Sequence, residues 1–482
     1  MTRKEFLLTL PAAALVPGLA HADEPAPPAT PTPAPAPKKA DAPKPLKVPP
    51  IQPGPPYLMV GPQLGHVSHD SALLWIRATA AAPWRVRLLE AGNPDAKLEF
   101  PGPELSESTA FTGIVEMKGL KPSTQYLLEV ALGGVEQVAA PLPSFLTAPP
   151  PGTAGRQRIA LGSCVGETIA SAAPAWAELA ARRDLGPEEG SFDLLLMLGD
   201  NHYANSTNLE KQRVYYTVHR LSAGWRDLAA RTPIYAIWDD HDFGPDNSDG
   251  TEKGKENSLV AFKEYWPNPS FGEADNPGCY FTFTRGDVQY FMLDCRYYRS
   301  PDKAPDGPEK TMLGEKQLAW LKRELASSKA RIKLLATGSE WETFSSDDSW
   351  KMYLLERNAF FDWLEEQKIE GIILLSGDRH FSSVYHVRGH FLELSGGPFG
   401  STNAKLGPNP ERMTGWDEGR LWFVLDLDTS KPEPAVAYEL WQAGGGLLER
   451  REVTWAQING REKMEPSKPP KPPRVQPKTA KS

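Results

Sequence analysis

The chain has 482 residues, 40% of them hydrophobic and 14 of them tryptophan, which is enough for two domains with a large apolar core. Its formal net charge is −8, and no basic groove-forming stretch stands out before the C-terminal tail. The composition therefore argues against a nucleic-acid-binding surface. The three cysteines are too few for disulfides to be the main source of stability.

The first 22 residues have the pattern of an export signal. Arg3 and Lys4 form a short basic start before an apolar stretch over residues 6–20, and the Ala-His-Ala at 20–22 supplies small residues around a cleavage point. The apolar stretch is too short, and too interrupted by prolines, to span a membrane. Lys4 stands where a twin-arginine signal has its second arginine, so the twin-arginine route and ordinary secretion both stay open. The sequence predicts an exported protein, periplasmic or extracellular, without a membrane span.

Composition divides the rest of the chain into four parts. Residues 23–56 are rich in Pro and Ala, which predicts an extended linker. Residues 57–148 carry short alternating runs separated by turn residues, which predicts a small fibronectin-like β-sandwich domain. Residues 156–460 alternate apolar strands with helical segments, which predicts an α/β domain built in layers. From residue 461 to 482 Lys and Pro dominate again, and a disordered tail is expected.

Inside the α/β part, the apolar runs and the helical periodicity can be placed in chain order. We expect helices at 173–183, 209–230, 258–265, 315–325 and 350–366, and strands at 158–164, 194–200, 235–238, 331–338, 371–377, 423–428 and 435–441. A hairpin is expected around Asp287, with Cys279 and Cys295 at equal distances from it. These two cysteines either pair or stay free and buried, and the second is favoured. In the preceding β domain, His66 and His69 are expected in loops or at the surface.

Three acidic clusters each follow an apolar run directly. They begin at Asp200, at Asp239 and at Asp378. Because the runs read as parallel strands buried on both faces, each cluster falls at the carboxyl end of a strand, where open α/β sheets bind ligands. Carboxylates gathered there repel one another unless cations lie among them. The pattern predicts a polynuclear metal site that performs hydrolysis.

The first cluster and the strand before it supply an unusual set of ligands. Tyr203 lies three residues after Asp200, so its phenol either binds a trivalent metal such as Fe(III) or merely bonds to the carboxylate. Cys164 ends the preceding strand, and its thiolate either completes an iron site or is an inert buried side chain. No Cys–His–Asn arrangement supports an acyl nucleophile.

The other two clusters offer carboxylates and imidazoles. Alternation along an extended segment would send Asp239 and His241 to one side and Asp240 and Asp242 to the other. The loop that follows adds Asp246, Asn247 and Asp249, which suit a Ca²⁺ or Mg²⁺ ion or a solvated turn. Asp378 and His380 also alternate onto one face, as a metal-binding pair or as a carboxylate–imidazole hydrogen bond.

Two arginines follow a further apolar strand. The guanidinium groups of Arg296 and Arg299 could clamp substrate phosphate, or could pair with the many nearby acids. The pairing alternative is slightly favoured for each.

In combination the motifs GSC, LGDNxY, WDDHD, LDxRxYR and SGDRH resemble the alkaline phosphatase D (PhoD-like) family of the calcineurin-like metallophosphatase superfamily. The resemblance implies a four-layer α/β/β/α core and a cofactor set of Fe(3+) and Ca(2+). It implies that the iron is surrounded by Cys164, Asp200, Tyr203 and Asp378, and that the calcium ions lie near Asp240, Asn247 and His380. Two departures stand out: His202, an extra ligand or an exposed residue, and Gly244-Pro245 in the loop before Asn247.

The predicted activity is that of an exported metal-dependent phosphatase and phosphodiesterase that hydrolyses phosphate monoesters and diesters for phosphate acquisition. His241 would donate a proton or orient a ligand. One alternative is a purple acid phosphatase-like enzyme, although the Gly-Asn-His-Glu and Gly-His-x-His motifs expected there are missing from the sequence. Another is a non-catalytic cell-surface binding protein on the same fold. The oligomeric state and the physiological substrate stay open.

Overall fold

The computed structural model describes residues 45–344 and 346–467. The predicted export signal, most of the linker and most of the tail lie outside these ranges. The prediction of a disordered tail is wrong for residues 461–467. Met464 is 5% exposed, and the main-chain N–H of Ser467 donates to the carbonyl oxygen of Met413. The folded domain therefore extends past residue 460.

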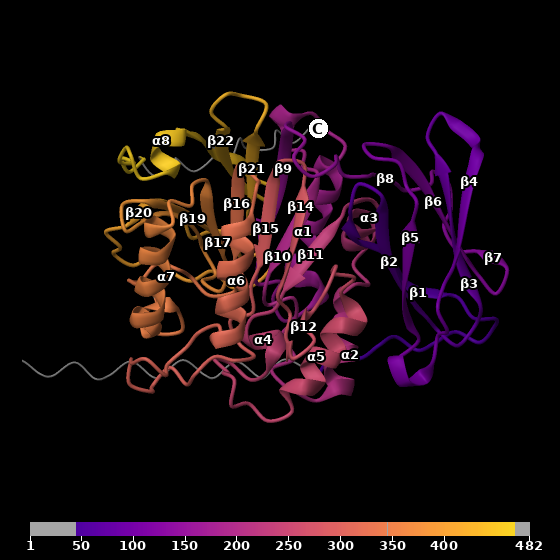
Figure 1. Ribbon diagram of the computed structural model, residues 1–482. Helices are drawn as coiled ribbons and strands as arrows, with labels where there is room; N and C mark the ends of the chain where they lie inside the picture. The colour runs from indigo at the N-terminus through magenta and orange to yellow at the C-terminus, as the bar shows by residue number, and fades with distance from the viewer. Residues whose placement is uncertain (1–44, 345, 468–482) are drawn as a thin grey trace, which may run out of the picture. The chain divides into compact units, whose positions relative to one another are not determined.

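The N-terminal part of the described chain consists of two antiparallel sheets around one hydrophobic core (Figure 1). One sheet contains β1 (Leu58–Val67), β2 (Ser71–Ala78) and β5 (Thr112–Lys118). The other contains β3 (Trp84–Glu90), β4 (Asn93–Pro101), β6 (Gln125–Leu132), β7 (Val135–Glu136) and β8 (Ser144–Leu146). In β3 every second residue at the start is buried, because successive side chains of a strand face opposite sides. A short 3₁₀ turn, η1 (Glu107–Thr109), precedes β5.

The α/β part contains a six-stranded sheet with the order β11-β10-β9-β21-β22-β23. Three strands at one side run parallel: β9 (Arg156–Gly162), β10 (Leu194–Leu198) and β11 (Ile234–Ile237). The other three are antiparallel to their neighbours: β21 (Leu421–Asp428), β22 (Ala435–Gln442) and β23 (Gly446–Val453).

A second sheet has seven strands in the order β14-β15-β16-β17-β19-β18-β20. Its centre is parallel and contains β15 (Val288–Met292), β16 (Ile332–Ala336), β17 (Ile372–Ser376) and β19 (Phe391–Ser395). Antiparallel strands at both sides complete it: β14 (Phe281–Arg285), β18 (Ser382–Val387) and β20 (Arg412–Trp416). A small ribbon of β12 (Gly272–Glu273) and β13 (Asn276–Pro277) precedes β14.

Four of the five predicted helices lie close to their predicted positions, one is divided, and two short helices of four residues each were not predicted. The helices are α1 (Ile169–Arg182), α2 (Leu209–His219), α3 (Ala223–Arg231), α4 (Asp240–Phe243), α5 (Lys255–Tyr265), α6 (Glu315–Ser327), α7 (Leu354–Glu366) and α8 (Trp455–Ile458), with 3₁₀ turns η2 (Pro187–Glu189) and η3 (Trp350–Tyr353). The single helix predicted over 209–230 is two helices. The break occurs because Ser222, the N-cap of α3, has the non-helical dihedral ψ of 129°.

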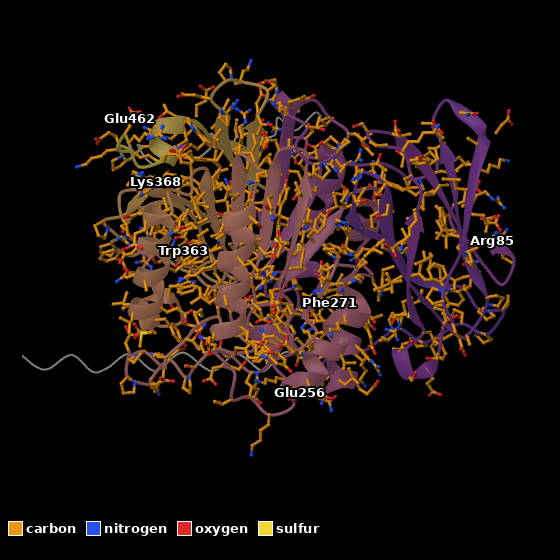
Figure 2. All side chains as sticks on the ribbon, viewed as in Figure 1. Arg85, Glu256, Phe271, Trp363, Lys368 and Glu462 are labelled. Atoms are coloured by element: carbon orange, nitrogen blue, oxygen red, sulfur yellow. The ribbon has the colours of Figure 1, made fainter. Side chains whose placement is uncertain are left out.

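The apolar runs are continuous because both faces of the second sheet are covered. In β15, Tyr290 and Met292 belong to a core shared with the first sheet, whereas Phe291 belongs to a separate core with Leu321 of α6 and Phe361 of α7. The strands β16 and β17 divide their residues between the two cores in the same alternating way. Figure 2 shows side chains throughout these layers, with Trp363 of α7 labelled.

The N-terminal sheets contact the α/β part through β1 and β2. The indole N–H of Trp75 donates to the carbonyl oxygen of Glu264 over 2.7 Å. The main-chain N–H of His66 donates to the carbonyl oxygen of Pro267 over 2.9 Å. His66 lies in β1 with its ring centroid 5.8 Å from those of Tyr235 and Phe283, so its predicted place in a loop or at the surface is wrong. The partial burial of His66 follows from this contact between domains.

The remaining sequence expectations concern the cysteines and the membrane. Cys164, Cys279 and Cys295 are all free and buried, so the favoured alternative for the hairpin pair is confirmed. Across residues 45–344 and 346–467, no helix has the length and apolar character needed to cross a bilayer.

Candidate metal centre

Four strand ends from the two sheets deliver their polar residues to one place. Cys164 follows β9, Asp200 follows β10, Asp240 follows β11 and Asp378 follows β17, each two or three residues beyond the strand. Three groups of possible ligands result, and within each the candidate atoms lie within 4.8 Å of one another. The groups are Cys164 with Asp200 and His380, Asp200 with Asp240 and His241, and Asp239 with Asp240 and Asp378.

The first group is joined by hydrogen bonds around Asp200 and Tyr203. The carboxylate Oδ2 of Asp200 accepts from the Cys164 thiol over 3.4 Å and from the Tyr203 hydroxyl over 3.2 Å. The Tyr203 oxygen lies 3.0 Å from Nε2 of His380 and accepts from the Ser401 hydroxyl over 2.7 Å. A thiol, a phenol, an imidazole and a carboxylate thus meet within one buried cluster.

Sharp backbone turns bring these side chains together. Cys164, Asp200, Asp378 and His380 all have positive φ, between 53° and 70°, a region that non-glycine residues rarely adopt. Gly199 allows Asp239 to approach, because a Cβ at position 199 would lie 2.6 Å from the Asp239 Cβ. Strained conformations of this kind often occur at functional sites, where the surrounding structure maintains them.

Several carboxylate oxygens in the cluster have no hydrogen-bond partner. Oδ1 of Asp200, Oδ2 of Asp239, Oδ1 of Asp240 and Oδ2 of Asp378 are all buried without a hydrogen bond from any described residue. Guanidinium nitrogens come no nearer than 3.9 Å to the Asp240 oxygen and 3.6 Å to the Asp378 oxygen. Buried polar atoms are rarely left in this state unless an ion or water completes them.

The electrostatics of the cluster point the same way. Burial and neighbouring carboxylates raise the pKa values of Asp200 and Asp378 well above their usual range. Burial raises the pKa of Asp239 to about 7, and burial with the nearby Asp200 raises the pKa of the Cys164 thiol. Cations among these groups would restore their anionic forms at neutral pH. The donor atoms therefore fit metal ions.

Comparisons with known proteins agree with this geometry. A family model described as PhoD-like phosphatase matches residues 160–416, and one described as a domain of unknown function (DUF7800) matches residues 55–150. The first match covers more than half of the chain. The chain belongs to the PhoD-like phosphatase family.

Individual relatives support the assignment. Alkaline phosphatase D of Bacillus subtilis (strain 168) is 24% identical over 408 residues, which cover 71% of this chain and 67% of that protein. A solved structure of PhoD has a TM-score of 0.65 at 21% identity and covers 84% of this chain and 94% of its own. A purple acid phosphatase from yellow lupin (Lupinus luteus) has a TM-score of 0.60 at 13% identity and covers 82% of this chain and 75% of its own. This PhoD-like chain is a phosphoric ester hydrolase with a mixed α/β fold.

The second cluster of this PhoD-like phosphatase does not alternate as an extended segment would. Helix α4 begins at Asp240 with Asp239 as its N-cap, so Asp239 and Asp240 both face Asp378. Asp242 turns away, and its carboxylate accepts from the main-chain N–H groups of Asn201 and Asp239. Asp239 was absent from the predicted ligands because its place depends on this helical turn.

The predicted place of Asn247 near a metal ion stays a prediction, whereas one of the two alternatives for His202, an exposed side chain, is wrong. Asn247 donates its main-chain N–H to Oδ2 of Asp240 over 2.7 Å, while its side-chain amide donates to Asp246. His202 is fully buried beside Tyr216, and its Nε2 lies 3.2 Å from the Gln212 side chain. His202 is therefore not exposed, and it belongs to none of the three ligand groups.

Arg296 and Arg299, the two arginines predicted as a possible phosphate clamp, do not line the cavity at the metal centre. Arg296 is completely buried, with Nε 2.5 Å from Asp239 and its Nη atoms bonded to Asp348. Arg299 is also buried and pairs with Asp302 and Asp348. Both arginines hold carboxylates in position, as the alternative interpretation predicted, and neither guanidinium faces the open cavity.

The open cavity beside the cluster has a volume of about 750 Å³. Its walls include Asp240, His241, Asp378, Arg379 and His380. Arg379 was missed by sequence reasoning, although its place between Asp378 and His380 was a signal. Its Nε lies 3.5 Å from the buried Glu340, which keeps the guanidinium at the cavity wall.

Proposed function

We propose that this phosphatase is an exported iron- and calcium-dependent enzyme that hydrolyses phosphate monoesters and diesters for phosphate acquisition. The observation that carries the proposal is the set of buried carboxylate oxygens without hydrogen-bond partners beside a thiol and a phenol. A finer description of the fold belongs to the same proposal: a four-layer α/β/β/α core preceded by a fibronectin-like sandwich.

The donor atoms divide between the proposed ions according to their chemistry. Cys164, Asp200 and Tyr203 combine a thiolate, a carboxylate and a phenolate, a set that suits Fe(III). Asp240 and Asp378, with Asp239, form an all-oxygen group that suits Ca²⁺. The grouping favours His380 as a ligand of iron, beside the Cys164 thiol, and Asp378 as a ligand of calcium, beside Asp240. The family resemblance implies the opposite assignment of these two residues.

Bound iron and calcium would act as Lewis acids that polarise phosphoryl oxygens and lower the pKa of water. The protein itself would position a proton donor for the leaving group. His241 lines the cavity, its ring centroid lies 4.2 Å from that of Tyr203, and its Nδ1 lies 2.5 Å from the side-chain oxygen of Asn205. Its Nε2 lies 3.7 Å from the Asp246 carboxylate. We assign His241 as the general acid.

Arg379 is the arginine that the cavity presents to a substrate phosphate. Its side chain is 23% exposed at the cavity wall, between two residues of the ligand groups. We expect Arg379→Gln to raise KM for a chromogenic phosphodiester about tenfold or more, because one charge-assisted hydrogen bond to phosphate is lost. The matched control is Arg388→Gln, on the surface beside Asp362, which should leave KM within about twofold. An unchanged KM in both variants would remove Arg379 from the substrate site.

The proposed function is tested by metal analysis combined with an assay. The purified chain should contain about one equivalent of iron and hydrolyse a chromogenic phosphodiester and monoester in a calcium-dependent way. Two transition metals without a calcium requirement would favour the purple acid phosphatase-like alternative. Folded protein that stays inert after iron and calcium are supplied would favour the binding-protein alternative.

A further inference from the structure

A separate cavity of about 490 Å³ lies at the opposite ends of the parallel strands. Its walls include Arg156 at the start of β9, Asp193 just before β10 and Pro233 just before β11. The metal centre lies beyond the carboxyl ends of the same strands. The seven steps of chain from Asp193 to Asp200 correspond to roughly 23 Å when extended, so the two sites are distinct.

Arg285 gives this cavity an unusual charge. It is the last residue of β14, lines the cavity and is only 5% exposed. Its Nε is buried without a hydrogen-bond acceptor, and no carboxylate in the described ranges forms an ion pair with its guanidinium. A buried cation without a partner is strongly unfavourable, so a site of this kind is completed by an anion or by water.

The other charged groups of the cavity already have partners. Arg158 donates to Asp426, to Glu439 and to the carbonyl oxygen of Ser191. Arg156 forms a bidentate pair with Asp426, and Arg183 pairs with Asp184. The carboxylate of Asp193 accepts from the main-chain N–H of Arg158. Arg285 is therefore the arginine of this cavity without an ion-pair partner, and Asp193, held by a main-chain N–H, is the one carboxylate of the same wall that no described cation pairs with.

Two leucines add an apolar wall to the same cavity. Leu146 of the N-terminal sheets is 43% exposed, and Leu185, which follows α1, is 42% exposed. Single exposed leucines are common on protein surfaces, but these two line one cavity together with an unpaired guanidinium. The combination suits a ligand with an anionic head and a small apolar body.

We propose that this cavity binds a small organic phosphate, with its phosphoryl group on Arg285 and its apolar part against Leu146 and Leu185. Guanidinium groups bind phosphoryl oxygens in a bidentate manner, and the cavity is large enough for a small organic group beside them. The site does not depend on the proposed metals or on the proposed reaction. It also gives the N-terminal sheets a direct part in ligand binding.

Equilibrium dialysis of the metal-loaded full chain with phenylphosphonate tests the proposal. We expect two bound equivalents, one at the metal centre and one in the Arg285 cavity. Arg285→Gln should lose the second equivalent or weaken it about tenfold or more, whereas Arg388→Gln, at an arginine outside this cavity that pairs with Asp362, should keep both. Leu185→Asp changes an exposed side chain and should weaken the same equivalent without affecting the fold.

Different probes decide the chemistry of the ligand. Phenylphosphonate should bind the cavity more tightly than inorganic phosphate, which lacks the apolar part, and more tightly than benzoate, which lacks the phosphoryl group. Equal stoichiometry in the wild type and Arg285→Gln would overturn the site. If benzoate bound more tightly than phenylphosphonate, the assignment of a phosphoryl group would be overturned. If inorganic phosphate bound as tightly as phenylphosphonate, the proposed apolar contact would be overturned. Phosphatase activity on a chromogenic diester, measured in parallel, separates this result from the proposed function.

Discussion

Asp200→Asn should lower kcat/KM for a chromogenic phosphodiester by about a thousandfold or more, because the substitution removes the charge shared by two ligand groups. Asp200 belongs both to the group with Cys164 and to the group with Asp240, and its Oδ1 has no hydrogen bond. An amide of the same shape keeps the packing but is a poor metal ligand. Steady-state kinetics and metal analysis of the purified variant give the measurement, with bound iron expected to fall together with activity.

The stability of the metal-free protein distinguishes a loss of metal binding from a loss of folding in the Asp200→Asn variant. Because burial and neighbouring carboxylates raise the pKa of Asp200, removing its charge should leave the metal-free protein at least as stable as the wild type. Asp227→Asn on the surface of α3 is the matched control and should retain full activity. An Asp200→Asn variant that keeps both its iron and its turnover would contradict the assignment of Asp200 as a ligand.

Arg296→Met should lower the free energy of unfolding by about 3–5 kcal/mol, the typical result of removing one partner from a buried ion pair. The substitution leaves the carboxylates of Asp239 and Asp348 buried without the guanidinium that both contact. Urea unfolding at neutral pH measures the loss. The exposed Arg388→Met, which removes a surface pair with Asp362, should change stability by less than about 1 kcal/mol.

The pH dependence of this loss follows from the two carboxylates. Although burial opposes it, Arg296 and Arg299 hold the pKa of Asp348 well below its usual range. A depressed pKa in the folded state stabilises the protein above the unfolded pKa of about 3.9, and this contribution disappears as the pH falls through the folded value. Without Arg296, Asp239, whose pKa burial already raises to about 7, takes up a proton near neutral pH, and Asp348 takes one up nearer its unfolded pKa of about 3.9. The deficit should therefore shrink progressively as the pH falls from about 7 to below about 4. A deficit that is independent of pH would indicate lost packing instead.

Much of the fold was predictable because local patterns and burial agree. The apolar runs before Asp200, Asp239 and Asp378 are strands β10, β11 and β17, since strands buried on both faces are short, near-continuous apolar runs. The helix predicted over 209–230 was wrong at its centre, because nothing in the helical periodicity marks the break at Ser222. Propensity alone is a weak guide where tertiary contacts decide.

The sequence predicted which residues supply metal-ligand atoms to the site, but not which of these residues face one another. The sequence indicated that Cys164, Asp200 and Tyr203 belong together, and the structure brings them into hydrogen-bond contact. It could not indicate that Asp239 faces Asp378, because a short helix replaces the expected extended segment. The metal identities are still proposals.

By itself the sequence determined the family, the order of the strands along the chain and the residue types that reach the carboxyl ends of the sheets. These properties depend on local patterns: apolar runs, their lengths and the acids that follow them. Only the tertiary structure decided that Arg296 is a buried partner of Asp239 while Arg379 faces the cavity. The physical reason is that burial and ion pairing depend on residues far apart in the chain. Arg296 and Asp239 meet only when the two sheets pack together, and Arg379 and Glu340 meet only when β16 and β17 pair in one sheet.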